Sequence, residues 1–214
     1  MPTKNQMALN FPTKVDFSAE NFMENSGNSK ALQTIQSLEN NGDIAVIYGK
    51  EGCGKSHLTS LWKNDVNAIN LHEIDLFTPE ITHVYVEDLD TLTSAQQEHL
   101  FHAFNHIKNV KGALLVTSHI PPAQLDLLAD LKSRLLLGEQ VEISLPNPQE
   151  LTVLLSKWAY DRQLELSPEV IQYLLKRCER SPKVLEACIA KLDTLSLEQK
   201  RRITVPLARE ALEI

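Results

Sequence analysis

A glycine-rich segment, residues 49–56, carries the side chains of this chain that are best suited to chemistry. It reads Gly-Lys-Glu-Gly-Cys-Gly-Lys-Ser, which is the pattern of a phosphate-binding loop, although a glycine-rich turn can match it by chance. Residues 43–48 before it predict a buried strand and residues 57–62 after it predict a helix. In that setting backbone N–H groups and the helix N-terminus face phosphate oxygens, Lys55 reaches the β- and γ-phosphates, and Ser56 ligates Mg²⁺. The expected contacts to a nucleotide are Gly49, Gly52, Cys53, Gly54, Lys55, Ser56 and His57.

Acidic side chains follow the next strongly apolar strand, residues 82–87, where such a loop needs a partner. One of Glu87 and Asp88 would hold the Mg²⁺ shell, and the other would orient or deprotonate an attacking water. The alternative is a strand end with ordinary solvated acids. Residues 112–117 predict a further strand, after which Ser118 is expected beside the phosphate loop, because ligands bind at the carboxyl edge of a parallel sheet. His119 is either a γ-phosphate contact or a surface histidine.

Composition and charge narrow the class of protein. The chain has 214 residues and a formal net charge of −7, which makes DNA binding a poor default because nucleic-acid binders usually carry a basic face. Apolar runs stay below the ~20 residues that span a bilayer, and the N-terminal residues do not resemble a signal peptide, so we expect a cytoplasmic protein without membrane contact. The three cysteines have no metal or redox spacing and are interpreted as reduced thiols. Cys53 is either activated by the positive potential of its loop or simply a small residue tolerated there, and we favour the second.

Strands and helices alternate along the first two thirds of the chain. Strands are expected at 43–48, 66–71, 82–87, 112–117 and 141–143, and a helix from Asn28 to about Gly42. This order predicts an α/β fold with a parallel five-stranded sheet covered on both faces. After the prolines at 146 and 148 the pattern is entirely helical, with start signals at Ser167-Pro168 and Ser181-Pro182 and a last helix at about 204–212. We expect an N-terminal peptide at 1–15, a nucleotide-binding core at 16–145 and a small all-helical domain at 146–214.

Two further segments resemble the AAA+ ATPases of the DnaA initiator type: Ser118-His119-Ile120-Pro121-Pro122, and Leu131-Lys132-Ser133-Arg134-Leu135 with Gly138. The resemblance implies an AAA+ P-loop NTPase core with a helical lid, binding ADP or ATP. It makes Arg134 an arginine finger offered to a neighbouring subunit's nucleotide, since a guanidinium can bind phosphate oxygens in a bidentate manner. It places Met23 and Asn28 in a segment over the adenine base, and Lys183 where the family's lid carries an arginine. Glu87 before Asp88 reverses the family's usual order, so the resemblance assigns Mg²⁺ ligation to Glu87 by position, and hydrolysis is expected to be slow.

The N-terminal residues 6–11 read Gln-Met-Ala-Leu-Asn-Phe and are similar to peptides that dock on the bacterial sliding clamp. Gln6 would bond at the rim of the pocket, while Leu9 and Phe11 would bury their side chains. Taken alone, such a string is more often an unstructured tail. Because the chain ends after the lid, without the initiator's DNA-binding domain, it resembles the clamp-bound Hda-type regulators of the family. The implied partners are the sliding clamp and the DnaA initiator, with a homodimer as a further candidate and sequence-specific DNA binding not expected.

The sequence leaves open two alternative functions for the chain and one possible metal site. A DNA-binding initiator or helicase loader would show salt-dependent DNA affinity. A P-loop enzyme that phosphorylates a small molecule would need an acceptor pocket, for which the sequence offers no insertion. His99, His102 and His106 are expected on one helix face, where they form either a metal site or, as we favour, a polar surface or subunit contact.

Overall fold

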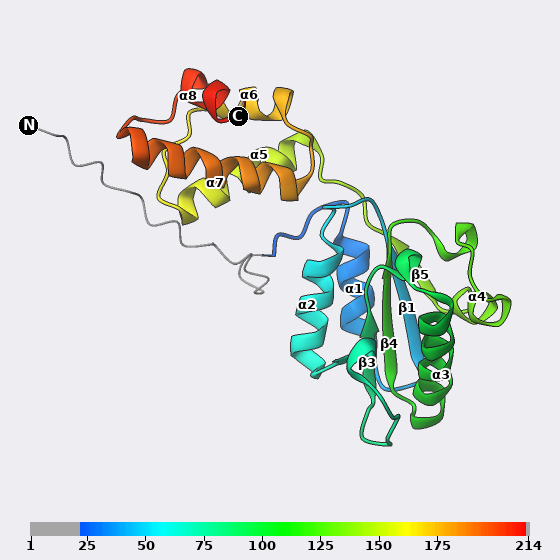
Figure 1. The fold of residues 1–214 in the computed structure, drawn as a ribbon. Coiled ribbons are helices and arrows are strands. Elements are labelled where there is room, and N and C mark those ends of the chain that lie inside the picture. Colours follow the sequence, from blue (N-terminus) through cyan, green and yellow to red (C-terminus); the bar gives the residue numbers. More distant parts are fainter. Residues whose placement is uncertain (1–21, 213–214) are drawn as a thin grey trace, which may run out of the picture. The chain divides into compact units, whose positions relative to one another are not determined.

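The computed structural model describes residues 22–212, which form two compact units separated between Ser144 and Leu145. The first unit is α/β and the second is all helical, as the sequence predicts (Figure 1). Each unit is described by itself.

The α/β unit is built on a five-stranded parallel sheet in the order β2-β3-β4-β1-β5. The strands are β1 (Asp43–Tyr48), β2 (Ile69–Asn70), β3 (His83–Val86), β4 (Ala113–Ser118) and β5 (Glu139–Glu142). Central strands β1 and β4 pair along their whole length, from Asp43 opposite Ala113 to Tyr48 opposite Ser118. Their carboxyl ends therefore meet at one edge of the sheet, where the loops that follow them lie side by side.

Four helices cover the two faces of this sheet: α1 (Ser29–Ser37) and α2 (Lys55–Val66) on one face, α3 (Ser94–Val110) and α4 (Ala129–Leu135) on the other (Figure 1). Short 3₁₀ turns lie at η2 (Leu71–Glu73), η3 (Leu89–Thr91) and η4 (Pro122–Gln124). Helix α3 begins at a capping box between Thr93 and Gln96, which satisfies two N–H groups at its start. Its apolar face packs on strands whose side chains are almost completely buried, so the sheet forms the centre of the core.

Two expected elements are shorter than predicted. The second strand, expected over 66–71, is only β2, because α2 continues to Val66 and ends at Asn67 in the left-handed region (φ 54°). Helix α1 ends at Ser37, five residues before Gly42, because Leu38 leaves the helical conformation (ψ 85°). Neither change moves the loops that follow β1, β3 and β4.

The helical unit consists of α5 (Pro148–Asp161), α6 (Pro168–Arg177), α7 (Pro182–Gln199) and α8 (Val205–Leu212). Three of them begin with proline, whose fixed φ and missing N–H suit the first helical position. Asn147 and Glu150 form a capping box at the start of α5. Apolar residues one turn apart, such as Leu151 and Leu155, are completely buried and form a separate small core. None of the described helices is long and apolar enough to cross a bilayer.

Candidate functional site

The glycine-rich loop leaves the carboxyl end of β1 and enters α2. The Gly49 N–H donates to the Ser118 carbonyl (3.1 Å), which fixes the start of the loop against β4. A Cβ on Gly49 would lie 2.3 Å from the Ile143 carbonyl oxygen, so no larger residue fits this close approach. Gly54 has φ 111° and precedes α2, whose first turn receives no side-chain cap. The loop thus presents a helix N-terminus without a side-chain cap, and such a terminus can bind phosphate.

Lys55 is the buried cation of this loop, with 7% of its surface exposed. Its Nζ donates to the carbonyl oxygens of Gly49 (2.6 Å) and Lys50 (3.3 Å). Ser56 is exposed next to it, and the imidazole of His57 meets the ring of Phe22 edge-on at 5.1 Å. The ammonium group is therefore held by neutral acceptors at the place where the sequence predicts phosphate oxygens.

Cys53 is a buried packing residue of the loop. Burial raises the pKa of its thiol, and this effect outweighs the nearby Lys55 charge, which lowers it. The thiol therefore stays protonated, in agreement with the interpretation of Cys53 as a small tolerated residue and against an activated one.

Glu87 and Asp88 follow β3 at the same edge of the sheet. The Glu87 Oε1 atom is buried and has no hydrogen-bond partner among the described residues. Asp88 adopts a left-handed conformation (φ 54°), and its N–H donates to Thr117 Oγ1 of β4 (3.2 Å). A buried carboxylate oxygen without a partner is costly unless a cation or donor reaches it. Glu87 therefore fits the expected Mg²⁺ shell, whereas Asp88 is exposed to solvent.

Asp90, a residue that the sequence analysis did not select, organises the end of β4. Its carboxylate accepts the His119 N–H (3.0 Å), contacts His119 Nδ1 (2.8 Å) and accepts from the Ser118 hydroxyl (3.2 Å). Burial raises the pKa of Asp90, but the hydrogen bonds from His119 oppose it and the net shift is downward. His119 thus holds Asp90 directly, while its Nδ1 lies 3.8 Å from Asp88. Asp90 could not be selected from the sequence, because it is one of three acidic residues within 87–90 and only the turn η3 brings it close to His119.

The segment expected over the adenine base, residues 22–28, is fixed by its own polar side chains. Asn28 is 6% exposed; its amide donates to the Met23 carbonyl (3.0 Å) and accepts the Asn25 N–H (2.8 Å). The Ser144 N–H donates to the Gly27 carbonyl (3.1 Å), which ties the segment to the end of β5. Asn28 therefore shapes the segment, and the Met23 side chain is half-buried beside it.

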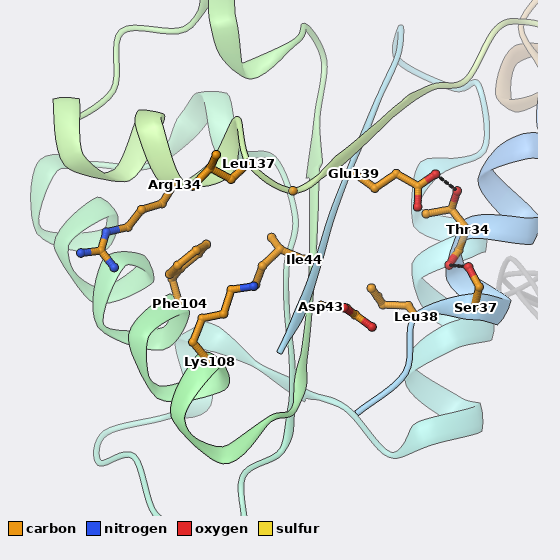
Figure 2. A pocket seen from close by; sticks show the side chains of 11 residues that line it. Thr34, Ser37, Leu38, Asp43, Ile44, Phe104, Lys108, Arg134, Leu137 and Glu139 are labelled. Atoms are coloured by element: carbon orange, nitrogen blue, oxygen red, sulfur yellow. Dashed lines mark hydrogen bonds between the residues drawn. The ribbon is translucent and has the colours of Figure 1, made fainter. Parts of the chain in front are cut away.

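Arg134 lies in α4, far from this edge. Its guanidinium stacks over Phe101 of α3 (4.4 Å to the ring centroid), lies 5.4 Å from the Phe104 centroid and donates to Asn105 Oδ1. Arg134 is one of the residues that line a cavity of about 340 Å³, and in Figure 2 its guanidinium lies beyond Phe104 and points away from the other lining residues. The cavity is also lined by Asp43, the first residue of β1, whereas the glycine-rich loop follows the last residue of that strand. Arg134 is thus half-buried against its own fold at the opposite end of β1.

Comparisons with known proteins agree with this geometry. Residues 148–212 match the family model described as "Hda, lid domain". The helical unit therefore matches an Hda-type lid, and the chain shares the fold of the solved structures that follow. Domain III of the DnaA replication initiation protein of Thermotoga maritima shares the fold, with a TM-score of 0.81 and 20% identity over 95% of this chain and 98% of that one. AMPPCP-bound DnaA from Aquifex aeolicus has a TM-score of 0.74 and 24% identity, covering 87% of this chain and 67% of that one. The RuvB Holliday junction branch migration motor of Thermotoga maritima has a TM-score of 0.70 and 17% identity, covering 92% and 72%.

The Hda-type lid comprises α5 to α8, and Lys183 occupies the first turn of α7 with its side chain exposed. A lysine carries a positive charge but lacks the planar fork with which an arginine binds phosphate in a bidentate manner. Gln6, Leu9 and Phe11 lie outside the described residues.

The three histidines of α3 do not form a metal centre. His99 and His106 lie against the ring of Phe77, with centroids 5.1 and 5.2 Å away, and His106 Nε2 bonds to the Ile81 carbonyl (2.8 Å). His102 instead meets Phe101. Within residues 22–212 no group of three potential ligands is placed to hold a metal ion. His99 and His106 thus pack against the connection between β2 and β3, while His102 is exposed, and a polar surface or subunit contact at these histidines stays a prediction.

Proposed function

We propose that the chain binds ADP or ATP together with Mg²⁺ at the loop after β1. Three observations support this: the uncapped start of α2, the Lys55 ammonium on neutral acceptors, and the unpartnered Glu87 oxygen. Lys55 would release its carbonyl contacts and hold phosphate oxygens, with Ser56 and Glu87 on the metal. The bound cation would neutralise phosphate charge and order the loop. AMPPCP in the DnaA structures with this fold agrees with an adenine nucleotide.

We further propose that Arg134 acts on a nucleotide held by a DnaA initiator subunit. The observation that supports this proposal is the surroundings of Arg134, which shares a cavity with Asp43 and Ile44 at the start of β1, whereas the chain's own phosphate loop follows Tyr48. At about 3.3 Å per residue, the strand from Asp43 to Tyr48 is about 17 Å long. This arrangement favours a triphosphate on another subunit over the chain's own nucleotide as the target of Arg134. The Hda match of the lid favours the initiator as that subunit.

The surface beside Arg134 suits a protein contact. Leu137, which lines the same cavity, is 85% exposed, and its neighbour Leu136 is also exposed. Large exposed apolar side chains next to a cation are typical of subunit interfaces. On docking, the Arg134 guanidinium would exchange Asn105 for phosphate oxygens and stabilise the charge that develops as the γ-phosphate leaves. A second copy of this chain could dock there in the same manner.

The N-terminal peptide would bring the chain to DNA-loaded clamp. Gln6, Leu9 and Phe11 supply the polar and apolar anchors of an extended docking peptide. Replacing Leu9 and Phe11 with alanine should abolish retention on immobilised clamp, while nucleotide binding stays unchanged. Unchanged retention of this double variant would remove clamp docking from the proposal.

The decisive experiment measures ATP hydrolysis by the initiator with and without this chain and DNA-loaded clamp. Arg134→Ala should abolish stimulation, since arginine fingers contribute on the order of 10³–10⁵ in rate. Its nucleotide affinity should equal that of the original chain. Lys108→Ala is the matched control, because this cation lines the same cavity but does not contact Asn105 in the described contacts. Stimulation that survives Arg134→Ala, or that is lost equally in Lys108→Ala, would refute the finger.

A further inference from the structure

Two cysteines of the Hda-type lid lie side by side. The Sγ atoms of Cys178 and Cys188 are 3.3 Å apart. Cys178 ends α6, where its N–H donates to the Leu174 carbonyl (2.8 Å), and Cys188 lies within α7. The turn between the two helices therefore places the two sulfurs in contact, although ten positions separate them in the sequence.

The two cysteines form a dithiol pair and not a metal site. Structural zinc sites need four ligands, and within residues 22–212 no group of three histidine, cysteine or acidic side chains is placed to hold a metal. Cys53, the third cysteine, lies in the other unit. The contact therefore involves only these two sulfur atoms among the described residues, and each can carry one exchangeable proton.

We propose that Cys178 and Cys188 form a reversible dithiol–disulfide pair, which a small-molecule disulfide such as oxidised glutathione closes. The inference rests on the contact between the two sulfurs, because two cysteines can form a disulfide only where their sulfur atoms approach each other closely. It extends the interpretation of the cysteines as reduced thiols, which rests on their spacing.

The pKa values of the two thiols indicate which sulfur reacts first. A hydrogen bond from the Cys178 thiol lowers the pKa of Cys188 to about 7, against the effect of burial and with help from Lys191. The same hydrogen bond raises the pKa of Cys178. The Cys188 thiolate attacks one sulfur of the reagent, and one glutathione leaves as a thiolate that takes a proton. Cys178 then loses its proton and attacks Cys188 Sγ, which expels the second glutathione. Two protein thiols are oxidised and one disulfide is reduced.

Closure would form a ring from residue 178 to residue 188 that contains the first turn of α7. Lys183 lies in this ring, so the bond would restrict the backbone that carries it. If Lys183 contacts the nucleotide of the proposed function, as the resemblance of the lid implies, oxidised and reduced forms differ in nucleotide affinity. Oxidation of the lid would then change nucleotide binding without any change in the phosphate loop.

The test uses the full chain with Cys53→Ser, which leaves only the pair. The protein is equilibrated in mixtures of reduced and oxidised glutathione, alkylated and weighed intact. The expected result is loss of both thiols together, without retained glutathione, and full reversal by dithiothreitol. The further variants Cys178→Ser and Cys188→Ser should each retain one glutathione at most. Thiols that remain free in the most oxidising mixture, stable glutathione adducts on the pair, or disulfide-linked dimers would overturn the proposal.

A second measurement separates this inference from the proposed function. Nucleotide affinity is determined for the reduced and the oxidised protein by equilibrium binding. A different affinity supports the link through Lys183. Equal affinities overturn that link while the disulfide stands, and absence of binding by the reduced protein counts against the nucleotide site itself.

Discussion

Asn105 contacts Arg134, and two substitutions of this residue are expected to change the stimulation of the initiator in opposite directions. In the chain alone, the guanidinium donates to the Asn105 amide oxygen and stacks over Phe101. If Arg134 serves another subunit's nucleotide, it must leave the amide, and the strength of this contact sets the fraction of free finger. Asn105→Ala weakens the contact and Asn105→Asp strengthens it, while both leave the rings in place.

The size of each effect follows from the half-exposed position of the pair. A hydrogen bond to a charged group contributes about 1.5–3 kcal/mol, and partial exposure reduces this to about 1 kcal/mol. Its loss in Asn105→Ala should raise the population of free Arg134 about fivefold. A carboxylate at position 105 would add an ion pair of about 0.2–1 kcal/mol and lower that population up to about fivefold.

The assay is the initiator's ATPase rate at subsaturating concentrations of the chain with DNA-loaded clamp. Asn105→Ala should stimulate at lower concentration than the original chain, and Asn105→Asp only at higher concentration. Urea unfolding checks that both variants fold, and nucleotide binding checks the core. If Asn105→Ala stimulates less than the original chain, the amide positions the finger in the working complex, and the reasoning from release is refuted.

Three further predictions concern other sites. Glu87→Gln should remove the Mg²⁺ dependence of nucleotide affinity but keep Mg²⁺-free binding, because the amide cannot replace the carboxylate as a metal ligand. Nucleotide titrations with and without EDTA check this. Asp90→Asn should lower the free energy of unfolding near neutral pH. The difference should start to shrink near pH 4 and disappear only below the lowered pKa of the Asp90 carboxyl, because the folded state keeps this group ionised to lower pH than the unfolded chain. Urea unfolding across pH, with His119→Asn as the matched loss of the partner, checks this. Cys178→Ala should raise the pKa of Cys188 from about 7 toward its ordinary value, because the stabilising hydrogen bond is lost; the ultraviolet absorbance of the thiolate against pH checks this in a Cys53→Ser background.

Much of the fold could be predicted because its signals are local. The apolar run at 43–48, the glycines after it and the acids after 86 each specify one strand end, and parallel pairing brings those ends together. The prolines at the helix starts of the lid also act within one turn. The strand expected over 66–71 was shortened because Asn67 ends α2 in a left-handed conformation, which the propensity of the apolar residues around it does not reveal.

The contacts that decide how the site works depend on pairs far apart in sequence. Asp90 meets His119 across two strands, and Asn105 meets Arg134 between two helices. Cys178 and Cys188 meet only because α6 and α7 fold back on each other. No spacing rule specifies these pairs, since each depends on the angle at which neighbouring elements pack. The side chains could be selected from the sequence, but their partners could not.

The two candidate cations share a feature that links the separate sites. Lys55 is held by two backbone carbonyls, and Arg134 is held by an amide oxygen and aromatic rings. Neither forms an ion pair with a carboxylate of residues 22–212. Neutral partners fix the position of a cation without neutralising it, so an arriving phosphate gains the full charge interaction and displaces only dipoles. A carboxylate bound to Lys55 or Arg134 would compete with phosphate for the cation, because both groups are anions. The proposed arginine finger would therefore depend on asparagine, and not aspartate, at position 105.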